Sequence, residues 1–402
     1  MASFENETLP TVTRWPSNAS NDTEPPFHQR TVDALTVVIS SIFAIECIVG
    51  LIGNALVIYV ILRYAKMKTV TNTYILNLAI ADELFMLGVP FTIQNMITLN
   101  WPYGTALCKI YLTNDVVTQF VSIFFLAVMS IDRYIAVVHP VQSVNYRNSR
   151  NAGIVSGCVW ALVIVLMSPA IIAFRSFGPH GDGTYGCGPQ WGPVFGETTF
   201  NLTEDDWRRI FSFYTFTLGY ALPLFIICVA YVLMLSRLRQ VGAPGSRGKK
   251  TRKVTKMVTV VVGVFFLCWS PYYIMNLCLH YIPPDLSQTT HNIVRTVFYT
   301  TQCVGYANSC ANPVLYAFLS DNFKKSFQKA FTCATDIQFE PSVSHFRRRS
   351  SKGKNDRHQA DNTTNSMNLR HCQTQAIMLS DSPTNGPAKA RRNGNDPEPV
   401  QL

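Results

Sequence analysis

Seven stretches of the chain are apolar enough and long enough to cross a lipid bilayer. Four of them contain no Asp, Glu, Lys or Arg: residues 151–174, 210–236, 257–279 and 296–320. Three more contain only one or two acidic residues: residues 34–62, 72–97 and 108–138. A transmembrane helix needs roughly 20 apolar residues, at about 1.5 Å per residue. The pattern therefore predicts an all-α membrane protein, built as a seven-transmembrane helix bundle over residues 34–318.

Polar segments flank the predicted bundle. Residues 1–33 lack the apolar core of about 7–15 residues that marks a cleavable signal peptide, so we expect the first span to insert the chain. Residues 319–333 place a phenylalanine at every fourth position with lysines between, which predicts a short amphipathic cytoplasmic helix on the membrane surface. Residues 334–402 are polar with few aromatic residues, which favours a disordered cytoplasmic tail.

The placement of charge predicts the orientation of the bundle. The chain has a net charge of +10, yet only 14% of its residues are charged, against about 25% in a soluble protein. Basic residues gather after the first span, between spans three and four, between spans five and six, and after span seven. These segments share one side of a seven-span chain, and basic loops remain in the cytoplasm. We therefore expect a plasma-membrane protein with its N-terminus outside and C-terminus inside, and no nucleic-acid partner.

Modification signals fit this orientation. Four Asn-X-Ser/Thr signals for glycosylation fall on the predicted outer side: Asn6, Asn18, Asn21 and Asn201. Cys108 opens the third span on that side, and Cys187 lies in the loop after the fourth span. Because the outer compartment is oxidising, we expect these two cysteines to form a disulfide. Cys333 follows the amphipathic helix and is a candidate for palmitoylation.

An acidic side chain near the outer end of the third span predicts a ligand site. Buried acids are rare in lipid because each costs about 2.5–3.5 kcal/mol even on a mild insertion scale. Asp115 stands two helical turns inside Cys108, and Gln119 lies one turn further along the same face. Tyr306 of the seventh span is placed to hydrogen-bond Asp115. The carboxylate is thus predicted to receive the cationic group of a ligand.

A second acid lies deeper in the predicted bundle. Asp82 is in the middle of the second span, and polar side chains lie at similar depth elsewhere: Ser122, Asn308 and Asn312. One carboxylate, one hydroxyl and two amides supply oxygen ligands for a small hard cation such as sodium. Two interpretations stay open, an allosteric sodium ion, which we favour, and a protonated Asp82 held by hydrogen bonds. No motif for catalysis or for any other cofactor is present, so we do not expect an enzyme.

The inner end of the third span reads Asp132-Arg133-Tyr134. Adjacent residues do not share a helix face. Arg133 must therefore curl back to Asp132 or reach a neighbouring span, where Thr255 can accept its hydrogen bond.

Prolines interrupt three of the predicted spans, and each has an aromatic residue near it. The pairs are Pro223 with Tyr231, Pro271 with Trp269, and Pro313 with Tyr316. Proline removes a backbone hydrogen bond and kinks a helix. Three such positions favour a bundle with two alternative packings.

These motifs together resemble the rhodopsin-like G-protein-coupled receptors. The resemblance covers all seven spans and extends to residue 331. It rests on Gly53-Asn54, Leu78-Ala-Ile-Ala-Asp82, Asp132-Arg-Tyr134, Trp160, Pro223, Cys268-Trp-Ser-Pro271 and Asn312-Pro-Val-Leu-Tyr316. Residues 115–120, 130–140 and 305–316 are most similar to somatostatin receptors, to their invertebrate counterparts the allatostatin C receptors, and next to opioid receptors.

The resemblance implies a receptor for a basic neuropeptide, somatostatin-like or allatostatin-C-like. The ligand's basic group would pair with Asp115 and contact Gln119. The same pocket would be lined by Trp269, Tyr272, Tyr273 and Asn276. The resemblance also implies coupling to Gi/o proteins, which lower cAMP, and recruitment of receptor kinases and arrestin by the tail. The C-terminal Val400-Gln401-Leu402 suits a PDZ-type groove.

The implied mechanism is a shift between two packings of the bundle. Ligand contact would pass to Trp269 and Phe265, span six would swing about Pro271, and Arg133 would be freed to face the G protein. Thr118 stands where related receptors usually have Asn, so sodium affinity is expected to be weaker.

Other functions fit less well. A biogenic-amine receptor would also use Asp115, but span five offers Thr215, Phe216 and Gly219 in place of the serine cluster that catechol receptors usually carry. An opioid-like peptide receptor is a further alternative. An opsin is excluded because residues 296–320 contain no lysine for a Schiff base. A transporter or channel would need a polar route through the whole membrane.

Overall fold

The computed structural model describes residues 34–179, 181, 183–195, 202–241, 246–283 and 287–338. The glycosylation signals at Asn6, Asn18, Asn21 and Asn201 and the tail beyond residue 338 lie outside the described residues, as does the side chain of Cys333.

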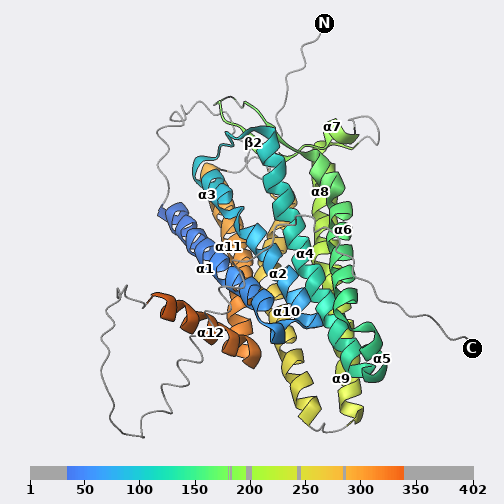
Figure 1. Ribbon diagram of the computed structural model, residues 1–402. Coiled ribbons are helices and arrows are strands. Elements are labelled where there is room, and N and C mark those ends of the chain that lie inside the picture. The colour runs from blue at the N-terminus through green and yellow to red at the C-terminus, as the bar shows by residue number, and fades with distance from the viewer. Residues whose placement is uncertain are drawn as a thin grey trace, which may run out of the picture. The chain divides into compact units, whose positions relative to one another are not determined.

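The described residues form a bundle of seven spans (Figure 1). In chain order the spans are α1 (Ala34–Arg63), α2 (Val70–Met86) with α3 (Val89–Thr98), α4 (Gly104–Val138), α6 (Ser149–Ala173), α8 (Glu204–Phe216) with α9 (Leu222–Val241), α10 (Ser246–Cys278) and α11 (Gln288–Leu319). A π-helical turn at Thr217–Ala221 joins α8 to α9. The predicted all-α seven-helix bundle is confirmed.

Six of the spans meet a simple test of length and apolarity for crossing a membrane, judged over the described residues. The exception is α11, which has many polar residues along its length. Side chains on the outside of the bundle are apolar: Ile52, Phe225 and Leu267 are each at least 66% exposed. Such exposure is unfavourable in water but suits contact with lipid.

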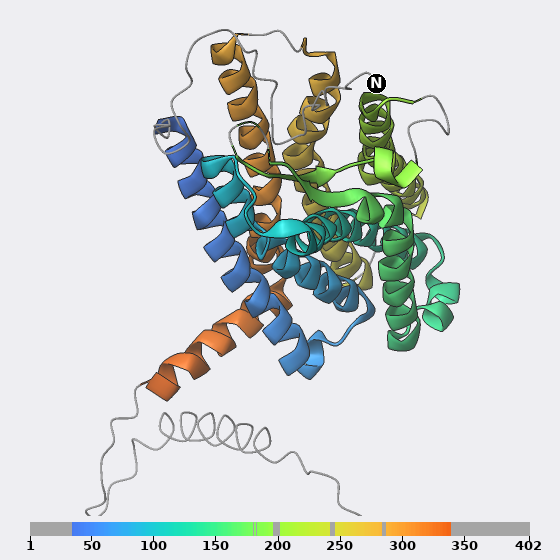
Figure 2. The same ribbon diagram turned by 90° about the horizontal axis from the view of Figure 1, so that it is seen from above.

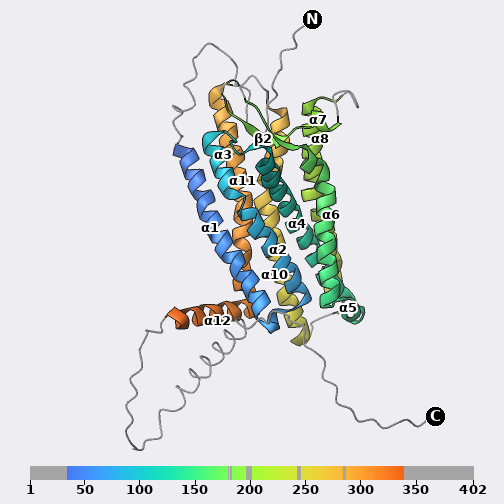
Figure 3. The same ribbon diagram turned by 45° about the horizontal axis from the view of Figure 1, so that its top comes forward.

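The helices pack around α4. This helix contacts α2, α6, α9 and α10, while α11 packs between α1 and α10. Large aromatic side chains fill the interior, including Phe43, Phe120, Phe125 and Phe265, each at most 1% exposed. In Figure 3, α4 lies in the middle of the bundle, where it contacts several helices at once.

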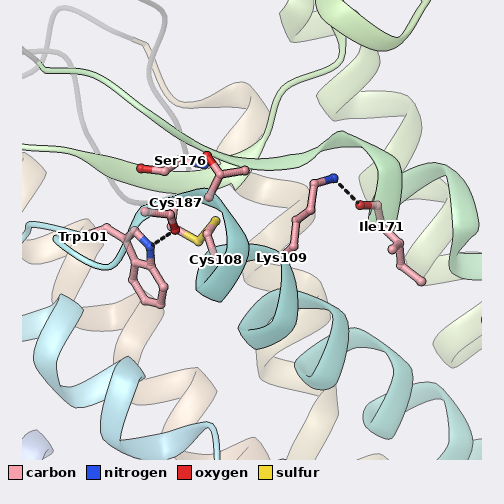
Figure 4. Close-up of a disulfide and its surroundings, with 8 residues drawn as sticks. Trp101, Cys108, Lys109, Ile171, Ser176 and Cys187 are labelled. Atoms are coloured by element: carbon pink, nitrogen blue, oxygen red, sulfur yellow. Dashed lines mark hydrogen bonds between the residues drawn. A yellow bond between two sulfur atoms is a disulfide. The ribbon is translucent and has the colours of Figure 1, made fainter.

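One end of the bundle carries a hairpin and a disulfide, and we call it the disulfide end. Strands β1 (Phe174–Phe177) and β2 (Gly186–Pro189) pair antiparallel and lie across this end in Figure 2. The Cys108–Cys187 bond joins the start of α4 to β2 (Figure 4), as predicted. Lys109 fixes the same helix to α6, because its Nζ donates to the carbonyl oxygens of Ile171 and Ile172 at 3.0 and 2.9 Å.

Three further α-helices and two 3-10 helices, η2 (Ala65–Met67) and η4 (Leu279–Tyr281), complete the described structure. α5 (Pro140–Tyr146) follows α4, and α7 (Gly192–Phe195) follows β2. α12 (Asp321–Gln338) begins two residues after the predicted start at 319 and continues past the predicted end at 333. No glycine or proline lies between residues 333 and 338 to end the helix there. The chain divides into two units after Phe327, and residues 328–338 are the described part of the second.

Gly53 permits close contact between α1 and α11. A Cβ atom built on Gly53 would lie 2.9 Å from Cγ of Pro313, whose ring cannot move away like a flexible side chain. A Cβ atom on Gly153 of α6 would meet nothing within 4 Å. The two glycines therefore form a matched pair, one at a tight helix contact and the other on an open surface.

We predict that Gly53→Ala lowers the free energy of unfolding by about 1–3 kcal/mol through overpacking. Gly153→Ala should be neutral or should stabilise by up to about 1 kcal/mol, because alanine favours helix. Thermal unfolding of the two purified variants in detergent tests this difference. Equal melting temperatures would show that the Gly53–Pro313 contact does not constrain the bundle.

Candidate functional site

A cavity lies at the disulfide end and holds about 1290 Å³ of empty space, including the part open to solvent. Residues of α3, α4, β2, α8, α10 and α11 line it. The lining includes five residues that the sequence places in a ligand pocket: Asp115, Gln119, Tyr272, Tyr273 and Asn276. A concave, largely aromatic site with a few convergent polar groups is typical of a ligand pocket.

Asp115 is the acidic residue among those lining the cavity. Tyr306 Oη donates to its Oδ1 at 3.2 Å, and Gln302 Nε2 donates to Tyr306 Oη at 3.2 Å. This confirms the predicted Asp115–Tyr306 hydrogen bond. Among the described residues no Lys or Arg forms an ion pair with Asp115. The carboxylate is therefore oriented, but no cationic side chain in the described part of the chain pairs with it.

Other polar atoms around the cavity also have unused hydrogen-bonding capacity. Three of them are buried without a partner in the part of the chain that the structure describes: Gln119 Nε2, Tyr273 Oη and Gln302 Oε1. A buried donor or acceptor without a partner costs about 1–3 kcal/mol. A ligand that supplies partners recovers part of that free energy on binding.

Trp269 and Tyr306, which the sequence also predicts to bind the ligand, lie behind the residues that line the cavity. Trp269 is only 4% exposed, and its ring lies 5.5 Å from Tyr272 and 6.5 Å from Tyr306 between centroids. The indole also packs on Phe265 at 6.2 Å. Trp269 is buried because aromatic side chains cover it, so it touches lining residues and not the cavity.

The second predicted site lies around Asp82, which is 1% exposed. Ser309 Oγ and Asn312 Nδ2 each donate to its carboxylate at 2.8 Å. Asn308 and Ser122 are buried, but neither hydrogen-bonds Asp82, and the carboxylate's hydroxyl partner is Ser309, which sequence analysis missed. The signal was available, because Ser309 lies three residues before Asn312 and so shares its helix face.

The oxygen atoms around Asp82 fit a small hard cation. Besides the carboxylate, Oδ1 of Asn308 and Oδ1 of Asn312 are buried with no protein partner. These are the oxygen ligands that such an ion prefers. The Thr118 hydroxyl is directed elsewhere, because it donates to the carbonyl oxygens of Asn114 and Asp115 at 2.6 and 3.3 Å.

The third cluster lies at the opposite end of α4. Arg133 curls back to Asp132 and also hydrogen-bonds Thr71 of α2. Arg147 also binds Asp132, with its Nε 2.7 Å from Oδ1. Thr255, the predicted acceptor, is not used, and its Oγ1 is buried without a protein partner. Thr71 replaces it because its hydroxyl lies within reach of both Arg133 and Asp132.

The remaining predicted switch residues lie on the helices that surround this cluster. Pro271 and Pro313 are inside α10 and α11. Tyr316 is buried, and its ring stacks on Phe323 at 5.5 Å. Tyr134 packs edge-on against His139 at 5.8 Å, and Tyr231 is half-buried on α9.

Comparison with known proteins gives a consistent result. Residues 53–316 match the model of the seven-transmembrane receptor (rhodopsin) family. Somatostatin receptor type 2 of Mus musculus is 45% identical over 316 residues, which cover 78% of this chain and 81% of that protein. Somatostatin receptor type 1 of Rattus norvegicus is 44% identical (73% and 71% covered), and type 5 of Bos taurus is 43% identical (74% and 76% covered).

The Asp132 cluster yields a test of stability. Asp132→Ala removes the carboxylate that two guanidinium groups share, and the Arg133 side chain is only 6% exposed. We predict that the free energy of unfolding falls by about 3–5 kcal/mol, as for a buried ion pair that loses one partner. Arg147→Gln should cost less than about 1 kcal/mol, because the Arg147 side chain is 27% exposed and Arg133 still pairs with Asp132. Thermal unfolding in detergent compares the two, and equal losses would contradict the shared-carboxylate arrangement.

Proposed function

The chain belongs to the rhodopsin family of seven-transmembrane receptors, and on that basis we propose that it is a G-protein-coupled receptor for a basic peptide of the somatostatin or allatostatin C kind. The family consists of receptors and not of enzymes. The observation that carries the proposal is Asp115, a carboxylate on a cavity wall, held by Tyr306 and without a cationic partner in the described part of the chain. The likeness to receptors named for somatostatin supports a peptide ligand.

The proposed recognition step is the pairing of a ligand ammonium or guanidinium group with Asp115. Tyr306 holds the carboxylate in place, so little rotamer entropy remains to be lost when the ion pair forms. Gln119, one turn along α4 with an unpaired Nε2, can accept or donate a hydrogen bond to the same ligand group. The aromatic walls supply apolar contact for the flanking residues of the peptide.

We propose that ligand contact is transmitted through aromatic packing. Tyr272 and Tyr273 line the cavity and pack against Trp269, which in turn packs against Phe265 two turns before Pro271. Because Pro271 lacks an N–H, α10 is weakest at this point. Movement of Trp269 would therefore be accommodated by bending α10 there. The part of α10 before Pro271 would then take a second packing at the end of the bundle that carries Arg133.

Orientation and coupling are proposed from charge and similarity. The proposed orientation has the end of α4 that carries Arg133 in the cytoplasm and the disulfide end outside the cell at the plasma membrane, and the basic loops support it. The resemblance to somatostatin receptors favours Gi/o proteins and lowered cAMP. Glycosylation of the outer segments, palmitoylation of Cys333, phosphorylation by receptor kinases with arrestin binding, and a PDZ-type partner remain proposals.

A sodium ion is proposed as an allosteric ligand at Asp82, with oxygen atoms from Asn308 and Asn312 completing the donor set. When bound, the ion would neutralise the buried carboxylate. The Asp82 hydrogen bonds from Ser309 and Asn312 tie α2 to α11 independently of the ion. The position of the Thr118 hydroxyl supports weak affinity for sodium.

We predict that Asp115→Asn weakens binding of a basic somatostatin-like peptide by roughly 3–5 kcal/mol, because the ligand's charge is left without its partner. A peptide in which the basic side chain is replaced by norleucine should bind the wild type weakly and should lose little more in the variant. Competition binding with the two peptides and the two receptors forms a double-mutant cycle, in which the coupling energy isolates the ion pair.

Tyr306→Phe serves as the graded control, since it removes the hydrogen bond to Asp115 and keeps the carboxylate. This variant should lose about 1 kcal/mol of binding free energy for the basic peptide. Unchanged affinity of the basic peptide in Asp115→Asn would refute the pocket assignment. Activation by small amines, with no response to any peptide, would instead support the amine-receptor alternative, which also depends on Asp115.

We predict that the agonist-bound receptor catalyses nucleotide exchange on purified Gi/o and not on Gs or Gq. The basic cytoplasmic loops and the similarity to somatostatin receptors support this choice. The measurement is the rate of GTP-analogue binding with each G protein in the same membranes. Equal or faster exchange on Gs would contradict Gi/o selectivity without affecting the ligand assignment.

A further inference from the structure

The cavity carries charges of both signs. Besides Asp115, its charged lining residue is Arg208 of α8, and the two do not form an ion pair with each other. His280 of the 3-10 helix η4, which follows α10, also lines the cavity, with its Nε2 2.7 Å from Ser212 Oγ. A ligand that enters this space therefore meets an acid from α4 and a base from α8.

Arg208 faces the cavity because of its register on α8. The lining residues of this helix are Arg208, Phe211, Ser212 and Thr215, which are spaced three and four apart. That spacing defines one helix face. The neighbouring Arg209 is outside this set and is exposed. Two adjacent arginines of equal charge thus differ in whether they reach the cavity.

The acidic residues near Arg208 do not use all the hydrogen-bond donors of its guanidinium group. Glu204 accepts hydrogen bonds from the backbone N–H groups of Trp191 and Gly192 at 3.0 Å. Asp206 caps the start of the helix by accepting from the Thr203 N–H, also at 3.0 Å. The ion-pair partner is Asp205, at 2.7 Å from Arg208 Nη2.

The pair with Asp205 is a weak competitor for Arg208. The Asp205 side chain is 49% exposed, whereas that of Arg208 is 14% exposed. Solvent-exposed partners hold a guanidinium weakly, because water and salt screen the attraction. Among the described residues, the Arg208 Nε has no hydrogen-bond partner. The guanidinium therefore keeps donors for a second carboxylate, and its planar fork suits that group.

We propose that Arg208 forms an anion subsite that takes a carboxylate of the peptide ligand while Asp115 takes its cation. This inference rests on the proposed function, since it adds the acidic group to the ligand that the same cavity would bind. The carboxylate can come from the peptide's C-terminus or from an acidic side chain. The ligand is thus a peptide with charges of both signs, and loss of either charge weakens binding separately.

The test uses three somatostatin-like peptides with the same basic residue. One has a free C-terminal carboxylate as its single acid, one is C-terminally amidated with a single aspartate, and one is amidated with no acid. Competition binding to the full-length receptor in membranes compares wild type, Arg208→Gln and the matched control Arg209→Gln, with surface expression measured for each.

At least one single-acid peptide is expected to bind the wild type about ten- to hundredfold more tightly than the peptide without an acid. The peptide with this advantage identifies the source of the carboxylate. The advantage should vanish in Arg208→Gln and persist in Arg209→Gln. Arg208→Lys, which keeps the charge but not the fork, should retain part of it. Asp205→Asn should raise the affinity, because it removes the competing acid.

Three outcomes would overturn the anion subsite. Equal affinity of all three peptides for the wild type refutes it without any variant, so misfolding of Arg208→Gln cannot conceal the result. Persistence of the advantage in Arg208→Gln also refutes it, as does an equal loss in Arg209→Gln. If none of the three peptides binds the wild type, the proposed peptide receptor itself fails, and the subsite fails with it.

Discussion

A carboxylate inside a helix bundle in lipid must find its partners within the bundle, and this constraint organises the interior of the protein. Asp132 is matched by two arginines, and Asp82 by a hydroxyl and an amide. Asp115 receives one hydrogen bond, from Tyr306. Of these three acids, the one with the fewest partners is Asp115, on the wall of the cavity at the disulfide end. The distribution of partners therefore separates the acids that hold the fold together from the one available to an incoming ligand.

Helix α11 connects two of the acids, Asp115 and Asp82. Tyr306, Ser309 and Asn312 follow each other at intervals of three along α11, so they lie near one face. The first contacts Asp115 on α4, and the other two contact Asp82 on α2. Any displacement of Tyr306 by a ligand therefore acts on α11, whose Ser309 and Asn312 hydrogen-bond Asp82. This physical connection consists of hydrogen bonds and one rigid element, which is a firmer basis for coupling than proximity alone.

The sequence predicts depth in the bundle better than rotation about a helix axis. The apolar runs locate all seven spans, and the two-turn distance from Cys108 places Asp115 correctly on the cavity. The sequence predicts Ser122 as a partner of Asp82 and Thr255 as a partner of Arg133. The partners in the structure are instead Ser309 and Thr71, which lie at comparable depths. A span that is apolar on most sides gives little indication of which polar residue faces inward. Trp269 illustrates the same limit, because its burial depends on aromatic neighbours contributed by α2, α10 and α11.

The end of α4 that carries Arg133 is built so that one partner can leave. Asp132 binds both Arg133 and Arg147, so departure of Arg133 leaves the carboxylate paired with a cation. Without Arg147, the same departure would strand a buried charge, at a cost of several kcal/mol. Thr255 Oγ1 and Tyr316 Oη, by contrast, are buried and have no partner among the described residues in this packing. A packing in which these hydroxyls gain partners recovers free energy lost here. This end of the bundle therefore holds hydroxyls that a second packing could satisfy, and a ligand that binds that packing more tightly shifts the equilibrium toward it.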